Sequence, residues 1–171
     1  MKILNSTIDD IDTIFDLYGE AINFQKTKFN KHWQGFERSL VETEIQENRQ
    51  WKIIIDETIA CIFAVTHEDE LIWGEKNNDS AIYIHRIVTN PLFRGNNHVN
   101  IIVEWAKEFC KNNNKQFIRM DTWGDNQKLI DYYQSCGFEF LGLTTLTKSD
   151  NLPKHYEGAC LSLFEIKINR Q

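Results

Sequence analysis

The sequence predicts an α/β fold built on one mixed sheet, and three observations support this. Strand-like apolar runs alternate with stretches of helical spacing along the whole chain. The elements follow in the order strand, two helices, three strands, helix, strand, helix, two strands, which is typical of helices packed on a sheet. The 171 residues contain two prolines and no internal repeat. We therefore expect a single domain over residues 1–171.

The first half of the chain provides a strand, two helices and a hairpin. Residues 2–6 read as a strand, and Thr7 is placed to cap a helix that begins near Ile8. A second helix is expected near residues 37–49. The runs 51–56 and 59–67 then read as two strands joined by a tight turn at residues 56–58. The helical spacing of the first helix is carried by Ile11, Ile14, Phe15, Tyr18 and Ile22.

The second half alternates strands with two helices. The acidic segment 68–80 reads as a loop, and strand 81–89 ends at Asn90-Pro91. Further strands are expected at residues 117–123, 138–147 and 160–168, the last two separated by a loop that holds Pro153. The helices are expected at residues 98–112 and from a cap at Asp125 or Asn126 through Ser135.

Composition and charge exclude several classes of protein. The net charge is −6, whereas a protein that binds nucleic acid is usually basic. The longest uninterrupted apolar run, residues 59–65, has seven residues, and a membrane-spanning helix needs about 20. The N-terminus lacks the apolar segment of a signal peptide. We expect a cytoplasmic protein with neither a nucleic-acid partner nor a membrane.

The cysteines and histidines do not form a metal-binding pattern. The four cysteines lack the CxxC spacing, and the five histidines lack the HExxH and HxxxH spacings. We expect the cysteines to be small buried residues in a reducing compartment, and we expect no metal.

Positive charge is concentrated in one segment. Residues 86–119 carry a net charge of +4, so the rest of the chain carries −10. A basic segment in an acidic protein suggests a site for an anion, although exposed lysines on a helix are also common on a solvated surface.

Two stretches are the most informative about function. The first is the strand, loop and helix start that read IHRIVTNPLFRGNNHV from Ile84 to Val99. The free N–H groups of a helix's first turn attract anions, Gly95 lets the backbone approach a ligand closely, and Arg94 offers donors for phosphate oxygens. The second stretch, from Arg119 to Phe138, combines a strand, Asn126 at a helix start, two adjacent tyrosines and an exit through Gly-Phe.

These two stretches resemble the GNAT superfamily of N-acetyltransferases. The first resembles the signature V-x-P-x-[FY]-R-G-x-G-x-G, and the second resembles N-x(6)-Y-x(3)-G-F. The matching residues are Val88, Pro91, Phe93, Arg94 and Gly95 in the first, and Asn126, Tyr133, Gly137 and Phe138 in the second. The resemblance implies a GNAT-like, mostly antiparallel sheet of about seven strands flanked by about four helices. It also implies acetyl-CoA as co-substrate and a primary amine of a small molecule, amino acid or peptide as acceptor.

The resemblance also implies which residues bind the coenzyme. In the family, pantetheine lies between the strands that match 81–89 and 117–123. It is bonded there to backbone near Ile87 and Val88, and the tyrosine that matches Tyr133 is placed near the thioester sulfur. The remaining candidate coenzyme-binding residues are Arg94, Gly95, Asn96, Asn97, His98 and Val99, around the pyrophosphate, and Asn126.

The pyrophosphate loop departs from the family pattern at two positions. Asn97 replaces a glycine, and Val99 replaces a glycine or alanine. Asparagine tolerates positive φ, but the methyl groups of valine could fill the space where phosphate approaches the helix. We therefore expect weakened coenzyme binding. His98 either compensates as an extra donor or is simply exposed.

The catalytic assignments are Tyr133 as the acid that protonates the leaving thiolate and His85 as the candidate base. Glu75, Asp121 and a water chain remain alternatives to His85. We expect the acceptor site in the aromatic part of the N-terminal third, at Phe24, Phe29, Trp33 and Phe36.

Two other functions stay open. One is a catalytically silent GNAT-fold protein that binds CoA or another ligand with a degenerate pyrophosphate loop. The other is an interaction module that uses exposed aromatic residues. Members of the family often pair through their last strands, so a homodimer is compatible with the sequence.

Overall fold

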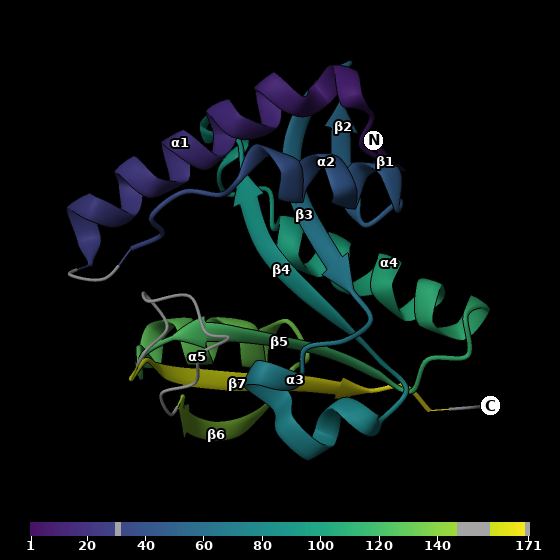
Figure 1. Ribbon diagram of the computed structural model, residues 1–171, viewed down its shortest axis with the longest axis vertical. Coiled ribbons are helices and arrows are strands. Elements are labelled where there is room, and N and C mark those ends of the chain that lie inside the picture. Colours follow the sequence, from purple (N-terminus) through teal and green to yellow (C-terminus); the bar gives the residue numbers. More distant parts are fainter. Residues whose placement is uncertain (30–31, 147–157, 170–171) are drawn as a thin grey trace. The chain divides into compact units, whose positions relative to one another are not determined.

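A computed structural model describes residues 1–29, 32–146 and 158–169 (Figure 1). Its seven strands form one sheet in the order β1-β2-β3-β4-β5-β7-β6. The described part also contains five α-helices. The expected mixed, mostly antiparallel sheet is confirmed, with one helix more than predicted. The predicted loop that holds Pro153 lies outside the described residues.

The chain divides into two compact units, each described here by itself. The first contains Met1–Val65 and Arg86–His98. Its strands β1 (Lys2–Asn5), β2 (Gln50–Ile55) and β3 (Thr58–Thr66) pair antiparallel in that order. The β2–β3 hairpin turns through Asp56 and Glu57, both with positive φ, as the tight two-residue turn requires.

Helices α1 (Ile11–Lys28) and α2 (Arg38–Gln46) pack on this part of the sheet. A 3₁₀ turn, η1 (Ile8–Asp10), leads into α1, and the Asp10 carboxylate accepts the Thr7 N–H. The core of this unit combines residues of both helices with strand residues. Its members are Ile11, Ile14, Leu17, Tyr18, Val41, Ile45, Ile62 and Val88.

The aromatic residues expected to form the acceptor site divide into two kinds. Trp33 and Phe36 pack against this core, with their rings 5.3 Å apart between centroids. Phe24 and Phe29 are instead 45% and 46% exposed. The first pair is partly buried and contributes to packing, whereas the second pair is more exposed.

The second unit contains Thr66–His85 and the chain from Val99 onward. Strand β5 (Phe117–Trp123) pairs antiparallel with β7 (Cys160–Lys167), which pairs antiparallel with β6 (Glu139–Thr145). On its other side, β5 pairs parallel with β4 (Ala81–Thr89). Helices α4 (His98–Asn112) and α5 (Gln127–Ser135) occupy the expected positions.

The segment predicted as a loop, residues 68–80, is largely helical. It forms α3 (Glu70–Trp73) and a 3₁₀ turn, η2 (Gly74–Asn78). Trp73 is buried against Ala81 and Tyr83 and is packed by Phe117 and Leu163. One buried tryptophan holds this short helix on the sheet, and four residues are too few to give a helical period in the sequence.

Helices α3 and α5 lie on opposite faces of the sheet in this unit. Trp73 of α3 packs with Leu163, whereas the ring of Tyr133 in α5 is 5.2 Å from that of Phe164. Because successive strand residues point to opposite faces, Leu163 and Phe164 mark the two sides. Each face of the sheet therefore carries its own set of side chains.

Two of the charges that made residues 86–119 basic are neutralised inside the protein. Arg119 is buried and donates to Asp79 and Glu165, and Arg86 donates to Glu44. These pairs hold elements together, so neither charge is available to attract an anion. The expectation of an anion site then depends on Arg94 and the loop around it.

The cysteines behave as expected. Cys61, Cys110 and Cys136 are buried free thiols, and Cys160 is partly buried and free. Burial raises the pKa of both Cys61 and Cys110 to about 12, which makes them unreactive at neutral pH. Among the described helices, none combines the length and the apolar character needed to cross a membrane.

Candidate active site

The pairing of β4 with β5 stops partway along both strands. The parallel ladder joins Ala81 to Phe117, Ile82 to Ile118 and Tyr83 to Arg119, and includes no further pair in the described chain. Strand β5 nevertheless continues to Trp123, and β4 continues beyond Tyr83. Beyond Tyr83 and Arg119, the two neighbouring strands are therefore not joined to each other by ladder hydrogen bonds in the described chain.

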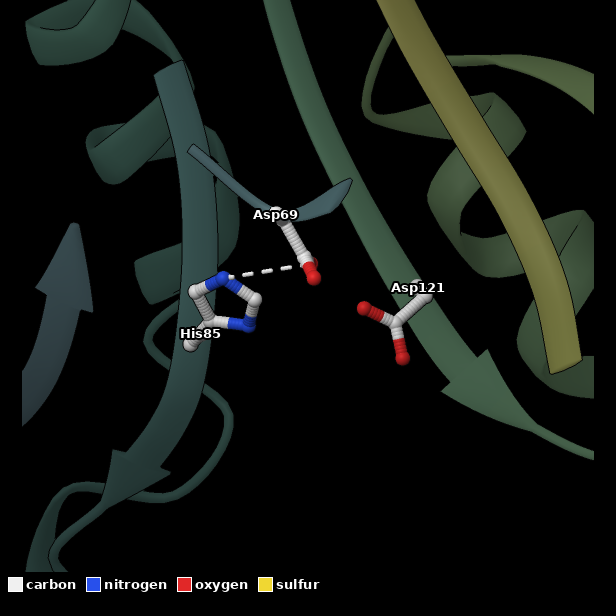
Figure 2. A group of neighbouring side chains, drawn as sticks. All are labelled: Asp69, His85 and Asp121. Atoms are coloured by element: carbon white, nitrogen blue, oxygen red, sulfur yellow. Dashed lines mark ion pairs between the residues drawn. The ribbon is translucent and has the colours of Figure 1, made fainter. Parts of the chain in front are cut away.

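Three ionisable side chains converge just past the end of this ladder. His85 and Asp121 lie two residues beyond Tyr83 and Arg119, so they point to the same face of the sheet as that pair. Asp69, which precedes α3, completes the group. Figure 2 shows the three side chains pointing toward one another, and one ligand atom from each lies within 4.8 Å of the others.

The hydrogen bonds around His85 define its tautomer. The Thr66 hydroxyl donates to the Glu68 carbonyl at 3.0 Å, so its oxygen acts as acceptor toward His85 Nε2 at 3.2 Å. In a neutral ring this places the proton on Nε2 and the lone pair on Nδ1, whereas a charged ring carries a proton on both nitrogens. Nε2 also lies 3.6 Å from Asp69 Oδ2, beyond normal hydrogen-bond length.

Both carboxyl groups are perturbed. Burial raises the pKa of Asp69 to about 6. Burial also raises the pKa of Asp121 to about 7, and the negative charge of Asp69 adds to that increase. Asp69 Oδ2 is buried and has no hydrogen-bond partner in the described structure. The three residues are of the kinds that hold a cation or exchange protons near neutral pH.

Sequence reasoning identified two members of this group and missed the third. His85 was the candidate base and Asp121 an alternative to it. Glu75, the other alternative, is exposed on η2 and does not belong to the group. No sequence signal identifies Asp69, because only the fold of the 66–80 segment brings it to the two strands.

Tyr133 lies on the other face of the sheet. Its ring is partly buried and packs against Phe164 and Phe138, with centroids 5.2 Å and 6.1 Å away. Asp121 pairs with Leu163, which belongs to the α3 face, whereas Tyr133 contacts the side marked by Phe164. The candidate acid and the candidate base therefore sit on opposite sides of the sheet.

The candidate coenzyme loop belongs to the first unit and has a distinctive backbone. Gly95 and Asn97 have φ values of 86° and 55°, and Asn96 between them is not in the positive-φ region. Alternation of handedness along successive residues turns backbone N–H groups toward a common point and forms a concave anion site. Residues 94–97 are exposed and lead directly into α4. Asn97 thus adopts the conformation that the family's glycine would supply.

The two residues that follow this loop are buried. Val99 is buried, so its methyl groups pack in the protein interior. His98 is also buried, which corrects the alternative that it is simply exposed. Its Nδ1 lies 3.4 Å from Thr89 Oγ1, and burial lowers its pKa, so the ring is neutral at neutral pH. Its Nε2 has no hydrogen-bond partner in the described structure, and a donor role for His98 stays a prediction.

Arg94 is exposed, but its guanidinium group already has a partner. It lies over the ring of Phe24, 4.9 Å from the centroid. A contact of this kind is worth about 0.5–1 kcal/mol at an exposed site, so a phosphate could displace it.

The irregular backbone of β4 precedes Ile87 and Val88. Arg86 has a φ of 50°, rare for a non-glycine residue inside a strand. Its guanidinium is fixed by Glu44 and lies 5.0 Å from the centroid of Phe36. Such an irregularity changes the direction of the backbone groups that follow it. Ile87 is partly exposed, and Val88 is buried in the core of the first unit.

Asn126 has a structural role. It is the N-cap of α5, and its side-chain oxygen accepts the Leu129 N–H at 3.3 Å. This resolves the choice between Asp125 and Asn126 as the cap. The amide nitrogen of Asn126 is the part of the side chain that this cap does not use.

The interrupted ladder, the loop before α4 and the α5 tyrosine can now be compared with known proteins. The sequence matches the Acetyltransferase (GNAT) family over residues 22–138, more than half of the chain. The chain belongs to the GNAT family of acetyltransferases. This confirms the resemblance inferred from the two motifs and makes the protein an N-acetyltransferase by family.

Relatives of this GNAT protein cover between 78% and 99% of its length at low identity. The uncharacterized N-acetyltransferase YesJ of Bacillus subtilis is 22% identical over 142 residues, 78% of this chain and 79% of that protein. A GNAT-family acetyltransferase structure from Listeria monocytogenes has a TM-score of 0.78 at 20% identity, covering 98% of this chain and 94% of that one. The putative acetyltransferase yncA of Salmonella typhimurium, solved with its cofactor acetyl-CoA, has a TM-score of 0.70 at 8% identity, covering 99% and 95%.

Proposed function

We propose that this protein transfers the acetyl group of acetyl-CoA to a primary amine. One observation carries the proposal: the β4–β5 ladder stops at Tyr83 and Arg119, and two residues farther on His85 and Asp121 converge with Asp69. In the GNAT family the pantetheine arm lies between these two strands. Proton-accepting groups at that opening are what an acceptor amine requires. We propose a single domain over residues 1–171 that carries this activity.

The loop before α4 fits the coenzyme's pyrophosphate. Gly95 and Asn97 supply the positive-φ positions of a concave amide site, and the start of the fifteen-residue helix α4 adds its dipole. The acetyl-CoA of the yncA structure supports the same ligand class here.

The chemistry divides between the two faces of the sheet. Acetyl-CoA supplies a thioester, whose acetyl carbon bonds to the amine nitrogen while the carbon–sulfur bond breaks and the thiolate is protonated. On the α5 face, the Tyr133 hydroxyl would provide that proton. On the α3 face, His85 Nδ1 would accept a proton from the amine. This arrangement lets the acid and the base act from opposite sides without neutralising each other.

Calorimetric titration with acetyl-CoA, followed by a thiol-release assay with a panel of primary amines, tests the proposal. We expect saturable binding and turnover. Tyr133→Phe should reduce kcat by roughly 100-fold, in the range of lost general-acid catalysis, and leave the Kd for acetyl-CoA nearly unchanged. If millimolar acetyl-CoA gave no binding heat, the enzymatic function would be refuted. Binding without turnover of any amine would favour the catalytically silent alternative.

A second experiment tests the coenzyme loop through the contact between Arg94 and Phe24. Arg94→Ala should weaken acetyl-CoA binding by roughly tenfold, because a charged hydrogen bond is lost. Phe24→Leu should tighten binding by about two- to fivefold, because Arg94 no longer has to leave an aromatic ring. Arg38→Ala, which removes another exposed arginine, is the control and should change neither value. An unchanged Kd in Arg94→Ala would exclude Arg94 from the site.

A further inference from the structure

Arg86 has a backbone conformation that is unusual for a strand. Its φ of 50° lies in the left-handed region, although the residue is inside β4. The other non-glycine residues with positive φ in the described chain lie in turns or loops: Asn48, Asp56, Glu57, Asn97 and Asn114. Such a conformation is costly for a residue with a side chain and persists only where the surrounding structure imposes it. The contacts of Arg86 therefore have to hold its backbone in place.

The side chain of Arg86 is fixed by a buried carboxylate. Its Nη2 donates to Oε2 of Glu44, which lies on α2 and has a side chain only 3% exposed. The guanidinium also lies over two aromatic rings, 5.0 Å from the centroid of Phe36 and 5.9 Å from that of Tyr18. A hydrogen bond between two charged groups is stronger than one between neutral groups. Glu44 thus holds one end of a side chain whose other end is the strained backbone.

The chain is anchored again at the end of β4. The Asn90 N–H donates to the Ala60 carbonyl at 2.9 Å, and the Asn90 side-chain amide donates to the Ile59 carbonyl at 2.9 Å. Val88, between the two anchors, is buried in the core of the same unit. Because this segment is fixed at both ends, the positive φ at its start determines the direction of the peptide groups of residues 86–88.

We propose that Glu44 is a positioning residue for acetyl transfer, which acts through Arg86 on the backbone of residues 86–88. This rests on the proposed function, in which the coenzyme bonds to backbone near Ile87 and Val88. When the amine attacks the thioester, negative charge develops on the carbonyl oxygen, and a backbone N–H aimed at that oxygen stabilises it. A displacement of about 1 Å caused by a distant substitution can cost about 100-fold in rate. Glu44 therefore controls kcat without contact with the reacting atoms.

A second arginine beside Glu44 provides a comparison. Arg49 Nη1 lies 3.7 Å from Glu44 Oε1, beyond normal hydrogen-bond length, and Arg49 Nη2 lies 2.6 Å from Glu47 Oε2. Arg49 is situated between α2 and β2, and its φ is not positive. Both arginines are near the same carboxylate, but of the two only Arg86 belongs to β4.

Glycine and valine at position 86 separate the backbone conformation from the side chain. Both are combined with Glu44→Gln, so that no buried carboxylate loses its partner. Glycine adopts positive φ readily, so Glu44→Gln with Arg86→Gly should keep kcat within about threefold of wild type. Valine opposes positive φ, so Glu44→Gln with Arg86→Val should lower kcat at least roughly tenfold. Equal kcat values in the two double variants would overturn the proposal.

Glu44→Gln alone tests the charge of the pair. The neutral amide holds the guanidinium less firmly, so kcat should fall roughly tenfold while the Kd for acetyl-CoA changes less than about threefold. Arg49→Gln is the matched control, because it removes the other arginine beside Glu44 and should leave kcat unchanged. Urea midpoints show how much stability each variant loses. A fall in kcat as large in Arg49→Gln as in Glu44→Gln would overturn the proposal and indicate a general loss of packing.

Backbone NMR separates this proposal from the proposed function. The amide and α-carbon chemical shifts of residues 86–88 report their conformation in the protein without acetyl-CoA. We expect Glu44→Gln to change the shifts of Ile87 and Val88, and Arg49→Gln to leave them as in wild type. Unchanged shifts in Glu44→Gln would overturn the proposal and leave the enzyme assignment standing. Wild-type protein that does not bind acetyl-CoA would refute the proposed function and the catalytic role of Glu44 with it, while the shifts would still show whether Glu44 sets the backbone.

Discussion

Two neighbouring charged groups on the same face of the second unit differ in how well they are satisfied. Arg119 is buried, and its guanidinium donates to Asp79, Glu165, the Lys76 carbonyl and the Tyr83 hydroxyl. Two residues along β5, Asp121 faces Asp69 and His85. The first group is saturated with hydrogen-bond partners, whereas in the second Asp69 Oδ2 is buried without one in the described structure. The comparison separates a charge that builds the fold from the carboxyl groups at the opening between β4 and β5.

The saturated group also positions the unsatisfied one. Asp79 and Lys76 belong to the segment that follows α3, and Trp73 of α3 lies 4.9 Å from the Arg119 guanidinium. Arg119 thereby ties the far end of the 66–80 segment to the sheet. Asp69 lies at the near end of that segment. Complete pairing of Arg119 therefore helps to hold the segment that carries Asp69.

The largest effect is expected from Arg119→Met. This change removes the cation but leaves Asp79 and Glu165 without their partner, which costs about 3–5 kcal/mol of unfolding free energy for a buried pair. Urea unfolding at pH 7 measures it. Arg38→Met, which breaks an exposed pair with Asp12, should leave the urea midpoint nearly unchanged. Equal midpoints for the two variants would show that Arg119 does not organise this face.

Asp121→Asn should instead increase the free energy of unfolding above neutral pH. Because the folded pKa of Asp121 is raised to about 7 from 3.8, folding disfavours its charged form, so wild-type stability falls as pH rises from about 4 to 7. The variant lacks this penalty. It should be more stable than wild type by about 4 kcal/mol at pH 8 and nearly equal to it at pH 4. Parallel pH profiles from urea unfolding would contradict the account.

Thr66→Val should have the smallest effect on stability. It should also change which nitrogen of the His85 ring carries the proton. The variant removes the oxygen that accepts from Nε2, at a cost of about 1 kcal/mol. The ring should then populate both neutral tautomers. Nitrogen NMR of labelled histidine reports this directly, with Thr58→Val on the exposed start of β3 as control. A wild-type tautomer pattern in Thr66→Val would show that Thr66 does not orient the ring.

Much of the fold could be predicted from the sequence, because its strands and long helices have clear periods. The hairpin at residues 50–66 and helix α4 lie within a residue or two of their predicted bounds. Asn97 was predicted to tolerate positive φ, and it adopts it. Helix α3 was missed because its four residues are held by one buried tryptophan rather than by a repeating pattern.

The site was less predictable, because neighbouring residues in the sequence do not show which side chains are buried or which ion pairs they form. Arg86 and Arg94 look equivalent in sequence, yet one is fixed by buried Glu44 and the other lies exposed over Phe24. His98 follows a polar, exposed loop but is itself buried. Asp69 resembles the other acidic residues of its segment until the fold places it beside His85.

The central claim is that Asp121, buried beside Asp69, keeps a proton near neutral pH. Carboxyl-carbon NMR of aspartate-labelled protein, with the Asp121 signal assigned by Asp121→Asn, measures this most directly. The account predicts an apparent pKa near 7. An apparent pKa near 3.8 would contradict it.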